Sequence, residues 1–129
     1  DKDSMYNTPP CWCIYMLGLV LDWLEEQGGI PGMEAIKHGK AQMLYDVIDS
    51  SKLFTCAVEP GSRSDMNVVF RTGSDELDAK FVKESVEAGF TNLKGHRSVG
   101  GMRASIYNAM PTEGVEKLCD FIKAFDKNN

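Results

Sequence analysis

The stretch KGHRSVGGMRASIYNA, residues 94–109, places a glycine-rich loop between two strand candidates. Residues 95–103 hold three glycines, two arginines and one histidine in nine positions. Phe90–Leu93 precedes the loop and Ala104–Asn108 follows it, and both segments carry residues typical of strands. The pattern predicts two strands separated by a loop with a specific task, because glycines let the backbone approach a ligand closely.

The flanking sequence supplies two further strands and two helices. Leu53–Val58 and Met66–Arg71 are predicted strands, joined by a turn at residues 60–62 and paired antiparallel. Ser74 is predicted to cap one helix and Thr112 the last one. The inner faces of these helices are predicted to be formed by Leu77, Phe81, Ser85 and Val86, and by Val115, Leu118, Ile122 and Phe125.

Two helices are expected near the amino terminus. The first starts at Asn7-Thr8-Pro9-Pro10, with Thr8 as the capping side chain, and ends at Gly28-Gly29. Its circumference is almost entirely apolar, which predicts burial by its own domain and by a further partner. The second runs from Met33 to Ile48, with Lys37, Lys40, Gln42 and Asp46 at its polar positions.

These elements follow the order α, α, β, β, α, β, β, α. The order predicts an α+β fold: a two-layer domain with a mainly antiparallel sheet and helices on one face, preceded by a long apolar helix. We divide the chain into a lead-in and interface helix, residues 1–29, and a small domain, residues 30–129.

Composition excludes several functions. Lys plus Arg number 14 against 19 Asp plus Glu, and a net charge of −5 argues against general nucleic-acid binding. The apolar stretch 11–24 contains Asp22 and is too short to span a bilayer, so no membrane role is expected. The spacing of Cys11, Cys13, Cys56 and Cys119 does not suit a metal site, and reduced thiols in the cytosol or an organelle stroma are expected.

The cations of the loop are candidate anion-binding residues. Arg103 begins a strand that would hold its guanidinium rigidly, whereas His96 and Arg97 lie at the loop tip and could reach a neighbouring subunit. The alternative is that both arginines form surface ion pairs and His96 is solvated. Asn7 and Thr8 form a second candidate, either an anion-binding helix start or a simple cap.

No complete catalytic motif is present, and because the chain begins with Asp1 rather than Met we expect it to be a fragment. The segment 94–109 resembles the signature of the phosphoserine aminotransferase family. Asn7-Thr8-Pro9-Pro10, Gly18-Leu19-Val20, Arg63-Ser64 with Met66-Asn67-Val68, and Glu113-Gly114-Val115 occur in the same order as in that family. The resemblance covers essentially the whole chain.

The resemblance implies the small carboxyl-terminal domain of a homodimeric fold-type I enzyme that uses pyridoxal 5'-phosphate. Such enzymes interconvert phosphoserine plus 2-oxoglutarate with 3-phosphohydroxypyruvate plus glutamate in serine biosynthesis. It implies that Asn7 and Thr8 hold the cofactor phosphate across the dimer interface. It further implies that Arg103 binds the substrate α-carboxylate, and that His96 and Arg97 contact the substrate phosphate from the adjacent subunit.

The Schiff-base lysine of the family belongs to sequence upstream of this stretch. We therefore expect no catalytic residue in this chain, and we expect the chain alone to be inactive and to hold no cofactor. The resemblance implies a cytoplasmic enzyme, or one from an organelle stroma if a transit peptide precedes it. The competing interpretation is a non-catalytic α+β module that binds a small anion through His96, Arg97 and Arg103.

Overall fold

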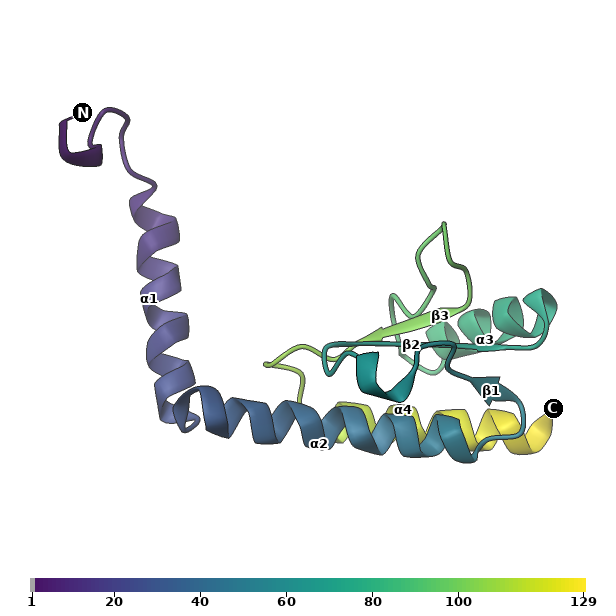
Figure 1. The fold of residues 1–129 in the computed structure, drawn as a ribbon. Helices are drawn as coiled ribbons and strands as arrows, with labels where there is room; N and C mark the ends of the chain where they lie inside the picture. The colour runs from purple at the N-terminus through teal and green to yellow at the C-terminus, as the bar shows by residue number, and fades with distance from the viewer. Residues whose placement is uncertain (1) are drawn as a thin grey trace. The chain divides into compact units, whose positions relative to one another are not determined.

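The computed structural model describes residues 2–129. The chain forms two compact units, Asp1–Ala35 and Ile36–Asn129. The predicted division at residues 29 and 30 stays a prediction. Among the described residues are four α-helices and a three-stranded sheet (Figure 1). The α+β class with an antiparallel sheet is thereby confirmed.

The first unit contains a short 3-10 turn, η1 (Lys2–Ser4), and helix α1 (Cys11–Glu26). The prediction that Thr8 caps this helix is wrong, because Pro10 is the N-cap residue and no side chain caps the end. A residue before a proline is disfavoured in the helical region, which disfavours Thr8 and Pro9 as helical residues, and α1 begins at Cys11. The predicted end is confirmed by Gly28, which has a φ of 89°.

None of the 16 residues of α1 is buried, although large apolar side chains surround it. Trp12 is 72% exposed and Leu17 is 57% exposed. That a further surface covers α1 stays a prediction. No helix of the described chain combines the length and the apolar character needed to cross a bilayer.

The second unit is built on the sheet, whose strands are β1 (Phe54–Thr55), β2 (Asn67–Thr72) and β3 (Met102–Ser105). They pair antiparallel in the order β1-β2-β3, which confirms the predicted pairing of the first two. The predicted strand Phe90–Leu93 is wrong, because Asn92 takes a φ of 61° and only Lys94 makes an isolated bridge, to Met102. The last strand begins two residues earlier than predicted and ends at Ser105.

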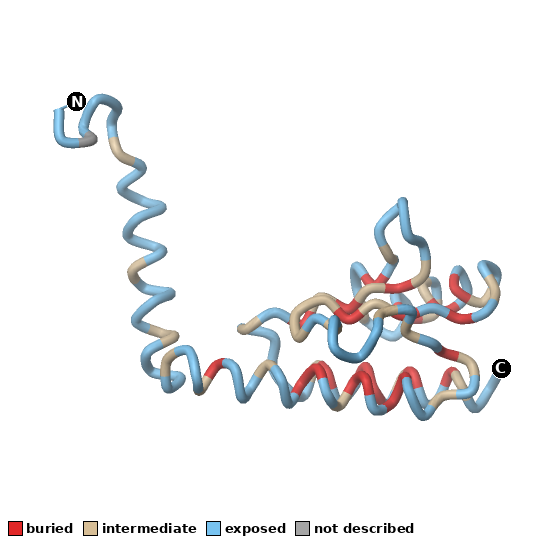
Figure 2. The backbone as a smooth tube through the Cα atoms, in the orientation of Figure 1, coloured by how far each residue is buried: buried red, intermediate tan, exposed pale blue. Residues whose placement is uncertain are grey.

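One face of the sheet is buried and the other is not. Residues of β2 and β3 alternate in burial along each strand, as expected for a sheet with a single core face. The buried face joins α2 (Gly29–Ser50), α3 (Asp75–Glu87) and α4 (Thr112–Asn128) in one core (Figure 2). All six phenylalanines of the chain lie in one aromatic cluster, with ring centroids 5.1–6.5 Å apart: Phe54, Phe70, Phe81, Phe90, Phe121 and Phe125.

The helix caps were predicted with mixed success. The Oγ atom of Ser74 accepts a hydrogen bond from the Leu77 N–H at 3.4 Å, which confirms this cap. Thr112 is instead the first helical residue of α4, and Pro111 before it is the N-cap without a side-chain bond.

Val86 of α3 is 57% exposed, so its predicted position on the inner face of the helix is wrong. It lies about 100° around the helix from Ser85, which is buried.

Lys40 was predicted at a polar helix position, and this prediction is wrong because its side chain is only 1% exposed. Its Nζ atom donates hydrogen bonds to the carbonyl oxygens of Tyr107 at 2.9 Å, Asn108 at 3.2 Å and Met110 at 2.8 Å. Burial lowers the pKa of Lys40 below its ordinary value. Lys40 therefore ties α2 to the segment that follows β3.

Candidate functional site

The loop between Lys94 and Met102 is closed by backbone hydrogen bonds at its base. The Gly95 N–H donates to the Gly101 carbonyl at 2.8 Å, and the Arg103 N–H donates to the Leu93 carbonyl at 2.7 Å. At the tip, the N–H groups of Val99 and Gly100 both donate to the His96 carbonyl at 2.9 Å. The loop therefore projects from the sheet as a defined turn (Figure 1).

The three glycines of the loop are required by its geometry. A Cβ atom at Gly95 would collide with the carbonyl oxygen of Gly100 across the base of the loop. Gly100 and Gly101 have φ values of 75° and 61°, a region that side chains disfavour. Gly100 and Gly101 thus take the positive φ that glycine adopts readily, while the predicted close approach of the loop backbone to a ligand stays a prediction.

His96 is exposed, and its ring is held by Ser98. The Ser98 N–H donates to Nδ1 of His96 at 3.3 Å, and the Ser98 Oγ atom lies 2.7 Å from the same nitrogen. Because Nδ1 accepts from the backbone, the neutral ring carries its proton on Nε2. This tautomer presents an N–H donor to an anion outside the loop.

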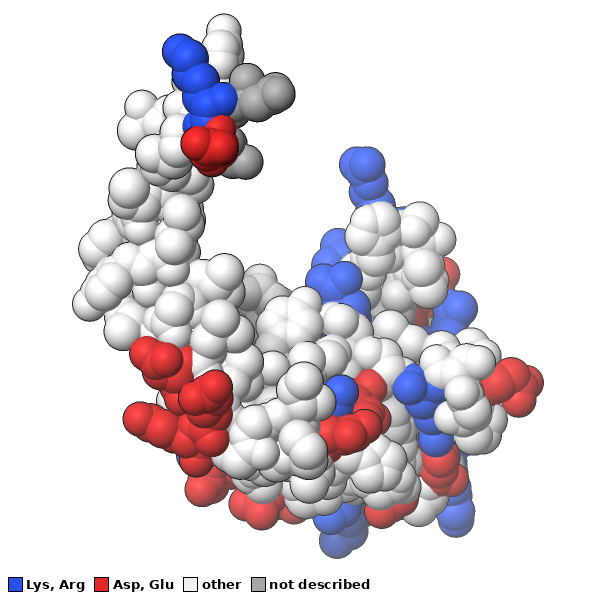
Figure 3. Space-filling model, turned by 60° about the vertical axis from the view of Figure 1, so that its left-hand side comes forward, with Lys and Arg blue, Asp and Glu red and all other residues white. Residues whose placement is uncertain are grey.

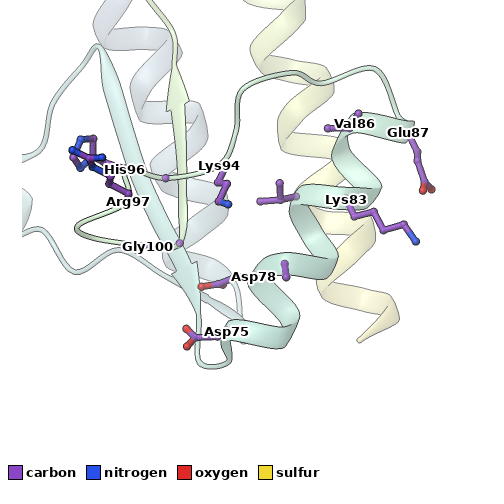
Figure 4. Close-up of a pocket in the computed structure, with 13 residues that line it drawn as sticks. Asp75, Asp78, Lys83, Val86, Glu87, Lys94, His96, Arg97 and Gly100 are labelled. Carbon is purple, nitrogen blue, oxygen red and sulfur yellow. The ribbon is translucent and has the colours of Figure 1, made fainter.

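His96 and Arg97 line an open cavity of about 740 Å³ between the loop and α3. The wall on the α3 side includes Asp78, Val82 and Val86. In the view of Figure 4, Lys94 points toward α3, whereas His96 and Arg97 are drawn on the side of the strands away from that helix. The cavity thus combines cations contributed by the loop with a wall on α3 that mixes apolar side chains and carboxylates, among them Asp78.

Arg103 does not line this cavity. Arg103 on β3 pairs with Val69 on β2. Both lie on the face of the sheet opposite the core, which we call the outer face. Arg103 is partly buried, and its Nε atom is buried without a hydrogen-bond partner among the described residues. Within one chain, therefore, the loop cations and Arg103 do not share a cavity.

The surface ion-pair alternative fails for both arginines. Among residues 2–129, neither Arg97 nor Arg103 lies within 4.0 Å of a carboxylate. Figure 3 shows Lys and Arg side chains standing out around the projecting loop, while acidic and basic groups alternate lower on this unit. Both guanidinium groups thus retain donors for an external anion.

A polar cluster on the outer face was missed by our sequence reasoning. The Oδ1 atom of Asn67 lies 3.2 Å from the Oγ atom of Ser105 and 3.4 Å from the hydroxyl of Tyr107, and both hydroxyls donate to it. Asn67 pairs directly with Ser105 across the strands. The signal available in the sequence was the two-residue spacing of Arg103, Ser105 and Tyr107, which places alternate residues on one face.

Asn7 and Thr8 lie in the other unit, directly before α1, and both are exposed. Within residues 2–129 no side chain caps α1, and the Cys11 N–H donates to the Pro9 carbonyl at 2.8 Å, so the N–H groups of Trp12 and Cys13 keep donor capacity that suits an anion. These residues therefore fit a phosphate as a donor set.

Comparison with known proteins places the chain among aminotransferases. The model of the aminotransferase class-V family matches residues 1–118. A phosphoserine aminotransferase from Listeria monocytogenes serovar 1/2a is 58% identical over 125 residues, which are 97% of this chain and 34% of that protein. One from Lactococcus lactis subsp. cremoris is 57% identical over 130 residues, covering 100% of this chain and 36% of that protein.

Solved structures agree. A phosphoserine aminotransferase from Bacillus circulans subsp. alkalophilus matches with a TM-score of 0.94 and 50% identity, over 98% of this chain and 35% of that one. A phosphoserine aminotransferase from Trichomonas vaginalis with bound PLP matches with a TM-score of 0.87 and 41% identity, over 95% of this chain and 35% of that one. The chain thus spans about a third of the length of these relatives. With 118 residues matched by the family model, the chain belongs to the class-V aminotransferases.

Proposed function

We propose that this chain is the carboxyl-terminal part of a phosphoserine aminotransferase. The enzyme would transfer the amino group between phosphoserine and 2-oxoglutarate, in serine biosynthesis. One observation of the structure carries the proposal: Arg103 is held on a rigid strand, and its buried Nε atom has no hydrogen-bond partner among residues 2–129. A buried cationic donor without a partner favours an anionic ligand, since an unsatisfied group of this kind costs free energy.

The substrate has two anionic ends, and the chain offers two separate sets of cations. We assign the α-carboxylate to Arg103, whose planar guanidinium can donate two parallel hydrogen bonds. We assign the phosphate to His96 and Arg97, which act on the active site of the adjacent subunit. The separation of the two sets within one chain suits this division, because each substrate would contact Arg103 of one subunit and the loop of the other.

We propose pyridoxal 5'-phosphate as the cofactor of the longer enzyme. When bound, it supplies an electron sink for breaking the bond between the substrate Cα atom and its proton. Within this chain, Asn7, Thr8 and the uncapped start of α1 would bind its phosphate from across the dimer interface. His96, Arg97 and Arg103 would orient the substrate by holding both of its ends.

The Schiff-base lysine lies outside this chain in the proposal, so the chain alone is inactive. We further propose that the enzyme is a homodimer in which the exposed apolar surface of α1 is covered. It would be cytoplasmic, or lie in an organelle stroma if a transit peptide directs it there.

The test joins this chain to the preceding part of the Listeria monocytogenes relative and measures phosphoserine turnover. We expect Arg103→Ala to raise KM for phosphoserine by about a hundredfold, since a charge-assisted bidentate contact is worth roughly 2–3 kcal/mol. The cofactor absorbance should stay nearly unchanged.

Arg71→Ala is the matched control, because Arg71 belongs to β2 and makes an exposed ion pair with Asp75 at 3.6 Å. We expect it to leave KM within about twofold. Unchanged KM in Arg103→Ala, or loss of the cofactor from that variant, would contradict the assigned role.

A further inference from the structure

We propose that Asn67 is a second carboxylate-binding residue beside Arg103, and that Ser105 and Tyr107 are positioning residues that orient its amide. This inference rests on the proposed function and deepens it. It predicts that the enzyme recognises a free carboxylate through two neighbouring planar donor groups on the outer face.

The sheet register brings the two donor groups together. Val69 pairs with Arg103 and Asn67 pairs with Ser105, so Asn67 and Arg103 are diagonal neighbours on the same face. Diagonal neighbours in an antiparallel pair lie about 7–8 Å apart, within reach of a long side chain. Both residues are partly buried, whereas the residues that follow them in sequence, Val68 and Ala104, face the core.

The hydrogen bonds determine which way the amide points. The hydroxyls of Ser105 and Tyr107 both donate to Oδ1 of Asn67, so the carbonyl side of the amide is fully engaged. The Nδ2 atom makes no hydrogen bond within residues 2–129 and lies on the opposite side of the amide. Its two N–H groups are therefore donors held in a fixed direction on the face that carries Arg103.

The backbone of Tyr107 is held by a hydrogen bond from Lys40. The Nζ atom of Lys40 donates to the Tyr107 carbonyl at 2.9 Å from within the core. Tyr107 is 54% exposed, so its ring is not held by burial. Tyr107 is therefore held at its carbonyl by Lys40 and at its hydroxyl by Asn67.

The arrangement suits a carboxylate better than other anions. A planar carboxylate can accept two bonds from a guanidinium and a third from an amide N–H on its remaining lone pairs. Asn67 adds a directed donor without adding charge, so it would strengthen discrimination against substrates that lack the carboxylate, such as amides and esters.

The decisive substitution is Asn67→Asp in the same joined enzyme. A carboxylate at residue 67 still accepts both hydroxyl bonds, so the urea midpoint should remain unchanged. It replaces the N–H donors by a negative charge near Arg103. We expect KM for phosphoserine and for glutamate to rise at least about tenfold, with kcat changed less than threefold.

Matched variants separate the roles. Asn92→Asp makes the same chemical change at an exposed loop position and should leave KM unchanged. Ser105→Ala and Tyr107→Phe each remove one donor to Oδ1, and each should raise KM about two- to threefold. In an Asn67→Asp background, the same two substitutions should add no further increase in KM, because the directed amide is already absent.

The outcomes distinguish this inference from the proposed function. A KM within twofold for Asn67→Asp, with a large increase in Arg103→Ala, would overturn the role of Asn67 and leave the proposed function standing. An unchanged KM in Arg103→Ala would contradict both the proposed function and the role of Asn67.

A second measurement uses this chain by itself and needs no turnover. In NMR spectra of the chain, the Nδ2 protons of Asn67 should exchange with water as fast as those of the exposed Asn128. The Asn67 resonances should shift in Ser105→Ala and in Tyr107→Phe. Slow exchange of these protons would show that they are already bonded within the protein, and the proposal would be wrong.

Discussion

Replacing Lys40 by methionine should destabilise the second unit, although it removes a buried charge. Lys40 is 1% exposed and donates to three carbonyl oxygens at 2.8–3.2 Å. Methionine fills a similar volume, so the substitution creates little cavity. It leaves the three carbonyls without their donor.

Two opposing effects set the magnitude. Each hydrogen bond from a charged donor contributes roughly 1.5–3 kcal/mol, while returning a buried ammonium group to water recovers several kcal/mol. Tyr107 and Met110 are largely exposed residues, so water can reach part of the vacated carbonyls. We expect a net loss of about 2–3 kcal/mol, which in a domain of this size lowers Tm by roughly 6–15 °C.

Urea unfolding of the chain, followed by far-UV circular dichroism, measures this difference. Lys117→Met is the matched control, because Lys117 is an exposed helical lysine of α4, and it should change the stability by less than about 0.5 kcal/mol. A Lys40→Met variant as stable as the parent would mean that desolvation of the ammonium outweighs its three bonds, and the reasoning would be refuted.

The pH dependence gives a second check on Lys40. Burial holds its pKa in the folded chain below the ordinary 10.5, so the unfolded chain binds the proton more tightly. Between the lowered pKa and 10.5, stability should therefore rise with pH in the parent relative to Lys40→Met. A difference that falls with pH in this window would contradict the lowered pKa.

Two further predictions concern single side chains. Ser74→Ala should cost about 0.5–1 kcal/mol because it removes the cap of α3, whereas Thr112→Ala should cost almost nothing, and urea midpoints decide between them. The hydrogen bond from Arg63 holds the pKa of Asp49 below its ordinary 3.8, so its contribution to stability should be lost as the pH falls through that lowered value. In Asp49→Asn this pH-dependent contribution to stability should be absent, and acid unfolding followed by circular dichroism measures it. An identical acid transition in the parent and in Asp49→Asn would contradict the ion pair.

Much of the fold could be predicted because local patterns and tertiary packing agree. The cap at Ser74 and the inner face of α4 follow directly from side-chain type and helical spacing. Errors arose where a neighbouring residue overrides the pattern. The consecutive prolines delay the start of α1, and the positive φ of Asn92 prevents a strand before the loop.

The candidate site was predictable only in part. The glycines and cations of the loop could be recognised from composition, since few loops need that combination. The burial of Lys40 could not, because its carbonyl acceptors lie 67–70 residues away in the chain. The cluster at Asn67 was likewise hidden, because it depends on the register between β2 and β3.

The aromatic residues of this chain are divided between its two units. Both tryptophans, Trp12 and Trp23, belong to the first unit, while every phenylalanine belongs to the core cluster of the second. Indole fluorescence would therefore respond to whatever surface covers α1. Fluorine-labelled phenylalanine would respond only to melting of the sheet and its helices. Assembly and folding could thus be followed as independent optical and magnetic signals in a single sample.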